Sequence, residues 1–93
     1  MSRKIREGVI CADVCGEHML VATLKARPYC RKRAILLNET GYQLMQFLQK
    51  GYSVDEMVQS FTKQYGSDGT QTERDIKTFF ENMEKEGFVE KYS

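Results

Sequence analysis

The sequence is poor in the residues that build catalytic and metal sites. It has one histidine, His18, and three cysteines, Cys11, Cys15 and Cys30, without C-x-x-C spacing. A zinc site needs about four such ligands at set spacings, and a nucleophile needs a nearby base. No glycine-rich phosphate-binding loop is present either. The sequence therefore predicts a protein that is not an enzyme and that needs no metal or other cofactor.

Long apolar segments are also missing. No run approaches the roughly 20 residues that cross a bilayer, and no signal-peptide stretch follows the charged start MSRKIREG. We therefore expect a cytoplasmic protein that does not contact a membrane. In that compartment cysteines are expected to be reduced thiols, buried or half-buried, and a Cys11–Cys15 bridge across a hairpin is the alternative.

What is present fits one small globular domain. With 93 residues, 41% of them hydrophobic and 29% charged, the chain can form one modest core. We expect residues 1–93 to form a single domain, with residues 1–8 as a flexible arm. The net charge of +1 hides an asymmetry, because residues 1–38 carry eight basic and three acidic side chains, whereas residues 39–93 carry six basic and ten acidic ones.

The stretch RAILLNETGYQLMQFL, residues 33–48, predicts a strand that leads directly into a helix. The strand has apolar side chains on both faces, Ile35 and Leu37 on one and Ala34 and Leu36 on the other, so neither face is expected to meet water. Asn38 is a suitable N-cap for the helix, which is expected to end at Gly51.

Two further strands and two further helices are predicted around this stretch. Residues 9–14 and 18–25 alternate like antiparallel strands joined at Gly16, and the basic residues 26–32 connect them to the strand at 32–37. Ser53 and Glu56 form a capping box for a second helix that ends at Gly66. A third helix is expected from residue 70 or 72 to Gly87, followed by a short strand or an unravelled tail over residues 88–92.

The order β-β-β-α-α-α predicts an α+β fold of winged helix-turn-helix type. In this fold a three-stranded antiparallel sheet is followed by three helices, and the apolar faces of both layers form one core. The segments LNETG at residues 37–41 and GYSVDEMV at 51–58, with the helix that ends at Gly51 between them, resemble the PqqD family. The resemblance extends over about residues 10–89.

The resemblance implies a peptide-binding function. PqqD-like proteins are small recognition elements for ribosomally made and modified peptides, and they serve pyrroloquinoline quinone synthesis, lasso-peptide maturation and other peptide pathways. The chain would bind the leader of a precursor peptide as an added β-strand and present it to a radical SAM protein, peptidase or cyclase. An exposed sheet edge suits this mode of binding.

The resemblance also implies where the leader would lie, in a groove between the strand at 32–37 and the third helix. The residues expected to contact it are Lys32, Arg33, Ala34, Ile35, Leu36 and Leu37 on the strand and Asp75, Phe79 and Phe80 on the helix. One of the two phenylalanines is expected to anchor the leader and the other to be core. Five of the apolar side chains near this site are also expected to build the core: Ile35, Leu37, Ile76, Phe80 and Met83.

Three points stay open at the level of the sequence. Asp75, Phe79 and Glu86 lie along one margin of the third helix and Lys77, Phe80 and Glu84 along the other, and either margin could face the strand. The cations Arg31, Lys32 and Arg33 could block indiscriminate strand pairing, attract an acidic leader, or do both. Residues 43–45, Gln-Leu-Met, stand near a position where PqqD-like proteins often carry a bulky aromatic residue.

The alternative function is a winged helix-turn-helix DNA-binding or regulatory domain. Such a domain would place its third helix in the major groove, where phosphate contacts need basic side chains. Residues 72–86 carry five acidic and three basic side chains, which disfavours a nucleic-acid partner. A further alternative is a structural module that self-associates through the same open sheet edge.

Overall fold

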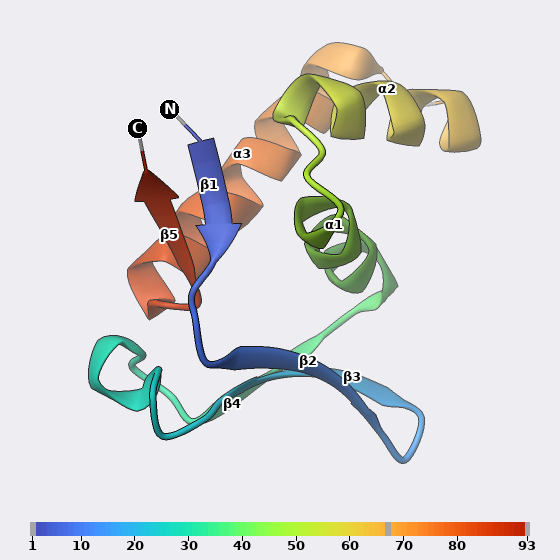
Figure 1. Cartoon of the computed structure of the whole chain (residues 1–93). Coiled ribbons are helices and arrows are strands. Elements are labelled where there is room, and N and C mark those ends of the chain that lie inside the picture. Colours follow the sequence, from blue (N-terminus) through green and yellow to red (C-terminus); the bar gives the residue numbers. More distant parts are fainter. Residues whose placement is uncertain (1, 67, 93) are drawn as a thin grey trace.

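The computed structural model describes residues 2–66 and 68–92, and it confirms the predicted α+β fold of winged helix-turn-helix type. One antiparallel sheet has the strand order β2-β3-β4, made of Val9–Val14, Glu17–Ala22 and Ala34–Leu37. Three helices follow it in the chain: α1 (Glu39–Gln49), α2 (Val54–Tyr65) and α3 (Gly69–Glu86). All three lie on the same side of this sheet (Figure 1). None of the helices in the described ranges is both long and apolar enough to cross a bilayer.

Two strands at the chain ends form a second sheet and correct the prediction of a flexible arm over residues 1–8. Strand β1 (Ser2–Ile5) pairs with β5 (Val89–Tyr92) in antiparallel register, and the two lie side by side in Figure 1. Ile5 packs against the core, and Glu90 forms ion pairs with Lys4 and Arg6 at 3.4 and 3.1 Å. Residues 2–6 are held because Ile5 packs against the core and the cations Lys4 and Arg6 meet Glu90 of the other strand.

The helix starts depend on short-range caps. Asn38 Oδ1 accepts a hydrogen bond from the Gly41 N–H at 2.8 Å, as predicted for the start of α1. The capping box of Ser53 and Glu56 is also present, with distances of 3.2 and 2.9 Å. Helix α3 begins at Gly69, earlier than predicted, because the Asp68 carboxylate accepts from the Thr70 N–H at 3.0 Å.

The core lies between the inner face of the β2-β3-β4 sheet and the three helices. Its largest fully buried side chains are Phe80, Phe88, Leu20, Met45, Met57 and Val89. Of the predicted core residues, Ile76, Phe80 and Met83 are buried, whereas Ile35 and Leu37 are half-buried and pack against the core. The C-terminal segment thus supplies two central core residues, Phe88 and Val89.

The outer face of the same sheet is open to solvent. Ile10 is 50% exposed and Leu36 is 62% exposed, and Val14 on the same face is also exposed. This corrects the expectation that neither face of β4 meets water. The helices cover one face alone, so the alternate residues of each strand remain outside.

The connector between β3 and β4 crosses the C-terminal end of α3. It contains a short 3-10 helix, Arg27–Tyr29, and the Arg31 N–H donates to the Glu86 carbonyl at 2.9 Å. Gly87 ends α3 with φ +92°, and a Cβ built on it would overlap the carbonyl oxygen of Tyr29. The start of β4 is therefore fixed against the last residues of α3.

Candidate peptide-binding site

Strand β4 is an edge strand with one unpaired side within the described residues. It pairs only with β3, and the Ala22 N–H donates to the Arg33 carbonyl at 2.7 Å in that ladder. Because hydrogen-bonded and non-hydrogen-bonded pairs alternate in an antiparallel ladder, Ile35 also bonds to β3, and the backbone groups of Ala34 and Leu36 point to the open side. The C-terminal strand does not cover this side, since β5 pairs with β1.

Helix α3 runs antiparallel to β4 and is tied to it near both ends. At the C-terminal end of α3, the Cys30 Sγ lies 3.3 Å from the Gly87 carbonyl, beside the bond from Arg31 to Glu86. At the other end the start of α1, which follows β4 directly, approaches Phe79, whose Cε1 would lie 3.1 Å from a Cβ on Gly41. The open edge of β4 therefore leads from a closed end at Glu86 to the N-terminal half of α3.

A cavity of about 450 Å³ lies among the three helices and is lined by Asn38, the residue that directly follows β4. We call it the end cavity. Its wall contains apolar side chains from all three helices and polar side chains from the helix starts: Asn38, Thr40, Gly41, Leu44, Phe61, Tyr65, Thr72, Asp75, Ile76 and Phe79. Buried Ile76 and Leu44 give it an apolar wall, and Asp75 is exposed. A cavity of this size and lining can hold one large apolar side chain.

The structure decides which margin of α3 faces the start of α1. Asp75 and Phe79 line the end cavity, and the main chain of Glu86 binds the connector ahead of β4. On the opposite margin, Glu84 lies 3.5 Å from Arg3 Nε of β1. Phe79 is half-buried, so it is the one of the two adjacent phenylalanines with accessible surface beside β4.

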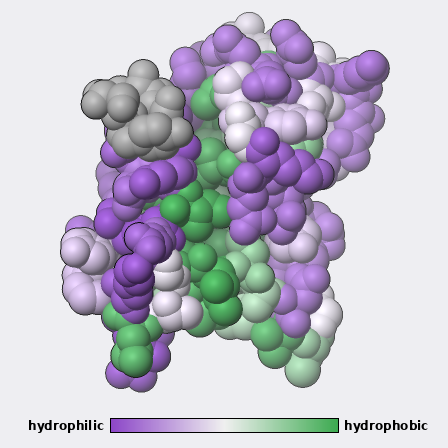
Figure 2. Space-filling view, viewed as in Figure 1, coloured by the Kyte–Doolittle hydropathy of each residue, from purple (hydrophilic) through white to green (hydrophobic). Residues whose placement is uncertain are grey.

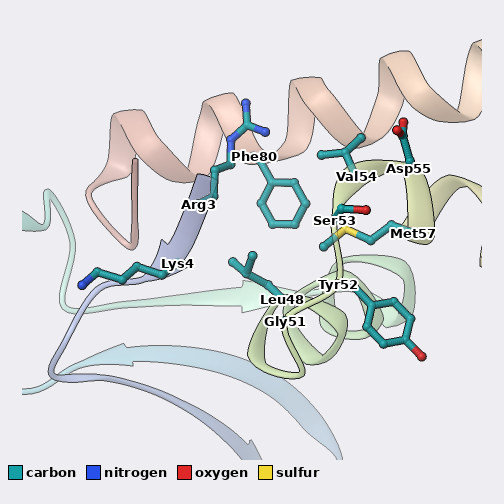
Figure 3. Close-up of a pocket in the computed structure, with 10 residues that line it drawn as sticks. All are labelled: Arg3, Lys4, Leu48, Gly51, Tyr52, Ser53, Val54, Asp55, Met57 and Phe80. Atoms are coloured by element: carbon teal, nitrogen blue, oxygen red, sulfur yellow. The ribbon is translucent and has the colours of Figure 1, made fainter. Parts of the chain in front are cut away.

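Phe80 belongs to the core, which corrects its inclusion among the peptide-contacting residues. It is 0% exposed and lies behind a second cavity, of about 370 Å³, between β1 and the α1–α2 connection. Figure 3 shows its ring between Arg3 and Met57, and Figure 2 shows hydrophobic surface running between the β1 side and α1. Phe79, the preceding residue, points toward the start of α1 instead, because successive side chains on a helix are about 100° apart.

The remaining predicted site residues lie along β4. Ala34, Ile35 and Leu37 are half-buried, and Leu36 is exposed on the outer face. Lys32 and Arg33 are exposed just before the strand. All of the predicted strand residues are thus brought to one edge, together with Asp75 and Phe79 across the end cavity. Contact of these residues with a peptide stays a prediction.

Cysteines and acidic groups do not form a second site. Cys11, Cys15 and Cys30 are free, so the Cys11–Cys15 bridge is not formed, and Cys15 is exposed rather than half-buried. Burial raises the pKa of the Cys11 and Cys30 thiols, which makes them poor nucleophiles. Among the residues that the structure describes, no cluster of three or more His, Cys, Asp or Glu side chains could hold a metal ion.

His18 holds the β2–β3 hairpin against the start of α1, a contact that the sequence did not predict. Its Nδ1 lies 2.5 Å from Asp13 and its Nε2 lies 3.1 Å from Glu39. The imidazole ring also stacks on Tyr42, with centroids 3.8 Å apart. His18 stands opposite Leu37 in the ladder, so this contact fixes the end of β4 that adjoins the end cavity.

Comparison with known proteins identifies the family. The family model of Coenzyme PQQ synthesis protein D (PqqD) matches residues 17–89. The chain belongs to the PqqD family. No curated protein sequence matches the chain at a significant level.

Two solved structures share the fold of this PqqD-family chain. One is described as TbiB1 in complex with the TbiA(beta) leader peptide, with 22% identity, a TM-score of 0.80, and coverage of 97% of this chain and 98% of that one. The other is lasso peptide synthetase B1 complexed with the leader peptide, with 21% identity, a TM-score of 0.83, and coverage of 98% and 100%. Both similarities span the sheet and the three helices.

Residues 43–45, the segment of α1 that departs from the PqqD pattern, contribute to the core. Leu44 is 3% exposed and Met45 is 0% exposed, so the two apolar residues of the segment 43–45 are core residues of α1. Leu44 also lines the end cavity. An aliphatic side chain at this wall leaves more room than a bulky aromatic residue would.

The charge state of His18 should make the stability of this PqqD-family protein depend on pH. Hydrogen bonds to Asp13, and then to Glu39, raise the pKa of His18 above its usual 6.5. The stabilising contribution is therefore complete below about pH 6.5 and is lost as the pH rises through the higher folded-state pKa. We expect a higher urea midpoint at about pH 6 than at about pH 8.5, and His18→Gln should reduce this difference.

The single imidazole allows a direct check, because its NMR signals can be followed without assignment. A folded-state pKa at or below 6.5 would contradict the two carboxylate contacts. An unchanged difference in urea midpoint between the two pH values in His18→Gln would show that other groups cause it.

Proposed function

We propose that this PqqD-family chain, as one domain over residues 1–93, is a peptide chaperone. It binds the leader of a ribosomally made precursor peptide by adding it as a strand to β4. It then presents the precursor to a separate modifying enzyme, such as a radical SAM protein, a peptidase or a cyclase. The observation that carries this proposal is the open edge of β4, which leads into the end cavity.

The open edge can bind the main chain of an extended peptide whatever the sequence of that peptide. The N–H and C=O groups of Ala34 and Leu36 point to the open side and can bond to the main chain of a peptide. Selectivity would come from side chains at alternate positions, one of which can enter the end cavity beside Phe79. The two similar structures, both complexes with a leader peptide, support this use of the fold.

The expected affinity is moderate. A free leader is flexible, and ordering it on the strand costs about 2–5 kcal/mol of the gross interaction. An affinity near micromolar, about −8 kcal/mol, is therefore expected. Moderate affinity suits a chaperone that must release the precursor after the enzyme has acted.

Catalysis would reside in the partner enzyme. The single histidine lies on the β2–β3 hairpin, where Asp13 and Glu39 of α1 engage it, and it is not among the residues that line the end cavity. The domain would act in the cytoplasm, where ribosomal precursors are made. Its role is then to raise the local concentration of the precursor beside the enzyme.

An NMR titration tests the proposed site. The ¹⁵N-labelled protein would be titrated with a panel of lasso-type leader peptides that includes the TbiA(beta) leader. We expect signals of Ala34, Leu36 and Phe79 to shift, and hydrogen exchange of the Ala34 and Leu36 amides to slow. Phe79→Ala should weaken binding at least tenfold, because truncating an aromatic side chain at the centre of an interface typically costs about 2 kcal/mol or more.

Two outcomes would count against this function. Shifts confined to β1 and β5 would place the peptide elsewhere on the fold. Failure of every leader in the panel to bind at about millimolar concentration would leave the open edge without its proposed ligand.

A further inference from the structure

Four exposed cations gather at the start of β4 without acidic partners. They are Arg27, Arg31, Lys32 and Arg33, and none of them forms an ion pair within residues 2–66 and 68–92. Other cations of the first half do pair, as Arg3 does with Glu84 and Lys25 with Glu7. The cluster is therefore an excess of positive charge at one end of the open edge.

Acidic side chains also lie close to this end. Glu90 pairs with Arg6, which contacts the Gly87 carbonyl and the Tyr29 ring. The main-chain carbonyl of Glu86 accepts from Arg31, and its carboxylate Oε2 is buried without a hydrogen-bond partner. Because none of the four cations has an acidic partner among the described residues, they leave this end positive. We call the four cations the basic end.

The opposite end of the open β4 edge, beside the end cavity, carries negative charge. Asp75 lines the end cavity and accepts a hydrogen bond from Gln71 Nε2 at 2.8 Å, and it has no cation partner in the described part of the chain. The Asp75 side chain is exposed, so its charge is accessible to a peptide at the end cavity. The path from the end cavity to the basic end therefore runs from negative to positive charge.

We propose that this charge gradient selects the direction and register of the bound peptide. The peptide class that fits carries one large apolar residue followed, four to six residues later, by two or three Asp or Glu residues. This inference rests on the proposed strand addition to β4 and specifies the chemistry of its ligand.

The spacing follows from the geometry of the ladder. All strand pairs in the sheet are antiparallel, and a peptide that continues the sheet in the same way runs opposite to β4. It meets the end cavity first and the basic end afterwards. If the anchor residue lies opposite Leu37, the third residue after it lies opposite Ala34 and the fourth opposite Arg33, where the β3–β4 ladder ends, and the following residues reach the other cations that precede the strand.

Side-chain alternation supports the same register. The anchor and the fourth residue after it are an even number of positions apart, so they share one face of the added strand. That face is the inner one, where Leu37 and the end cavity lie. The fifth residue would face outward, on the side of Lys32. Reversing the peptide would put its acidic residues toward Asp75 at the end cavity, where like charges repel.

Three synthetic peptides of about 12 residues separate direction from composition. The forward peptide has one phenylalanine and three glutamates at the fourth to sixth positions after it. The mirror peptide has the same residues with the glutamates before the phenylalanine, and the amide peptide has glutamines in their place. Binding would be measured by fluorescence anisotropy at about 25 mM and about 500 mM salt, where screening differs strongly.

We expect the forward peptide to bind about tenfold more tightly than the mirror and amide peptides at low salt, and less than about twofold more tightly at high salt. In the double variant Lys32→Glu/Arg33→Glu this preference should disappear. A forward peptide with lysines in place of glutamates should then bind this variant more tightly than it binds the wild type.

A matched control makes the same change in net charge elsewhere. Lys50 and Lys63 are exposed and have no ion pair in the described ranges, so Lys50→Glu/Lys63→Glu alters the total charge without touching the basic end. This variant should keep the preference for the forward peptide. Loss of the preference in the control would show that net charge alone acts, and would overturn the inference.

The remaining outcomes separate the inference from the proposed function. Equal binding of forward and mirror peptides by the wild type, or tighter binding of the mirror, would overturn the proposal that charge selects the peptide direction. It would leave strand addition intact. If neither these peptides nor the leader panel binds, the proposed function itself fails.

Discussion

Replacing Gly87 with alanine is expected to destabilise the protein by about 3–5 kcal/mol, a large part of the 5–15 kcal/mol that holds a typical domain folded. Gly87 has φ +92°, which disfavours any residue with a Cβ. The added carbon would also overlap the Tyr29 carbonyl and lie 2.9 Å from Cys30 Cα. Backbone of the connector would have to move, since no side-chain rotation relieves these contacts.

That movement would break the hydrogen bonds that hold the connector to α3. These are the bond from the Arg31 N–H to the Glu86 carbonyl and the contact of Cys30 with the Gly87 carbonyl. Each is worth about 0.5–1.5 kcal/mol. Thermal unfolding monitored by circular dichroism should show a midpoint lower by about 15–30 °C.

Two other glycines provide matched controls. Gly51 and Gly66 also have positive φ, at +86° and +65°, but a Cβ on either would meet nothing within 4 Å. Alanine at these positions should cost about 1 kcal/mol each, from backbone strain alone. Similar losses at all three positions would show that the contact between connector and α3 is not tight.

Leu36→Pro is expected to weaken leader-peptide binding at least tenfold while the protein stays folded. The Leu36 N–H points to the open side of β4, so proline removes a donor that a bound peptide would use, without removing a β3–β4 hydrogen bond. Binding would be measured with the leader panel and stability by urea unfolding.

Two further substitutions in β4 serve as controls for Leu36→Pro. Leu36→Ala keeps the N–H and removes a side chain that is 62% exposed, so it should bind peptide normally. Ile35→Pro removes a donor that faces β3, and it should lower stability by about 3 kcal/mol. Normal peptide binding by folded Leu36→Pro would rule out strand addition at this edge.

Local signals in the sequence predicted the central sheet and the helices well. Caps such as Asn38 and Ser53 act over three residues, and apolar periodicity reports directly which face is buried. The β1–β5 sheet could not be predicted in this way, because it pairs two short, mostly polar segments that are more than 80 residues apart in the sequence.

The candidate site was predicted less completely than the fold. Phe79 and Phe80 are both aromatic and adjacent, and only the packing of α3 against β1 shows that Phe80 is the core residue. The His18 contact had one readable signal, since His18 and Asp13 are opposite each other across the predicted hairpin. Its second partner, Glu39, comes from another element and could be found only from the structure.

The position of Phe88 and Val89 has a consequence for synthesis of the chain on the ribosome. Both side chains are buried at the centre of the molecule, at 0% and 1% exposure, and strand β1 needs their segment as its partner. The hydrophobic interior therefore stays incomplete until residues 88–92 have left the exit tunnel. A nascent chain would expose β4 and the helices in a loosened state, and stable capture of a precursor would begin only after translation has passed this segment.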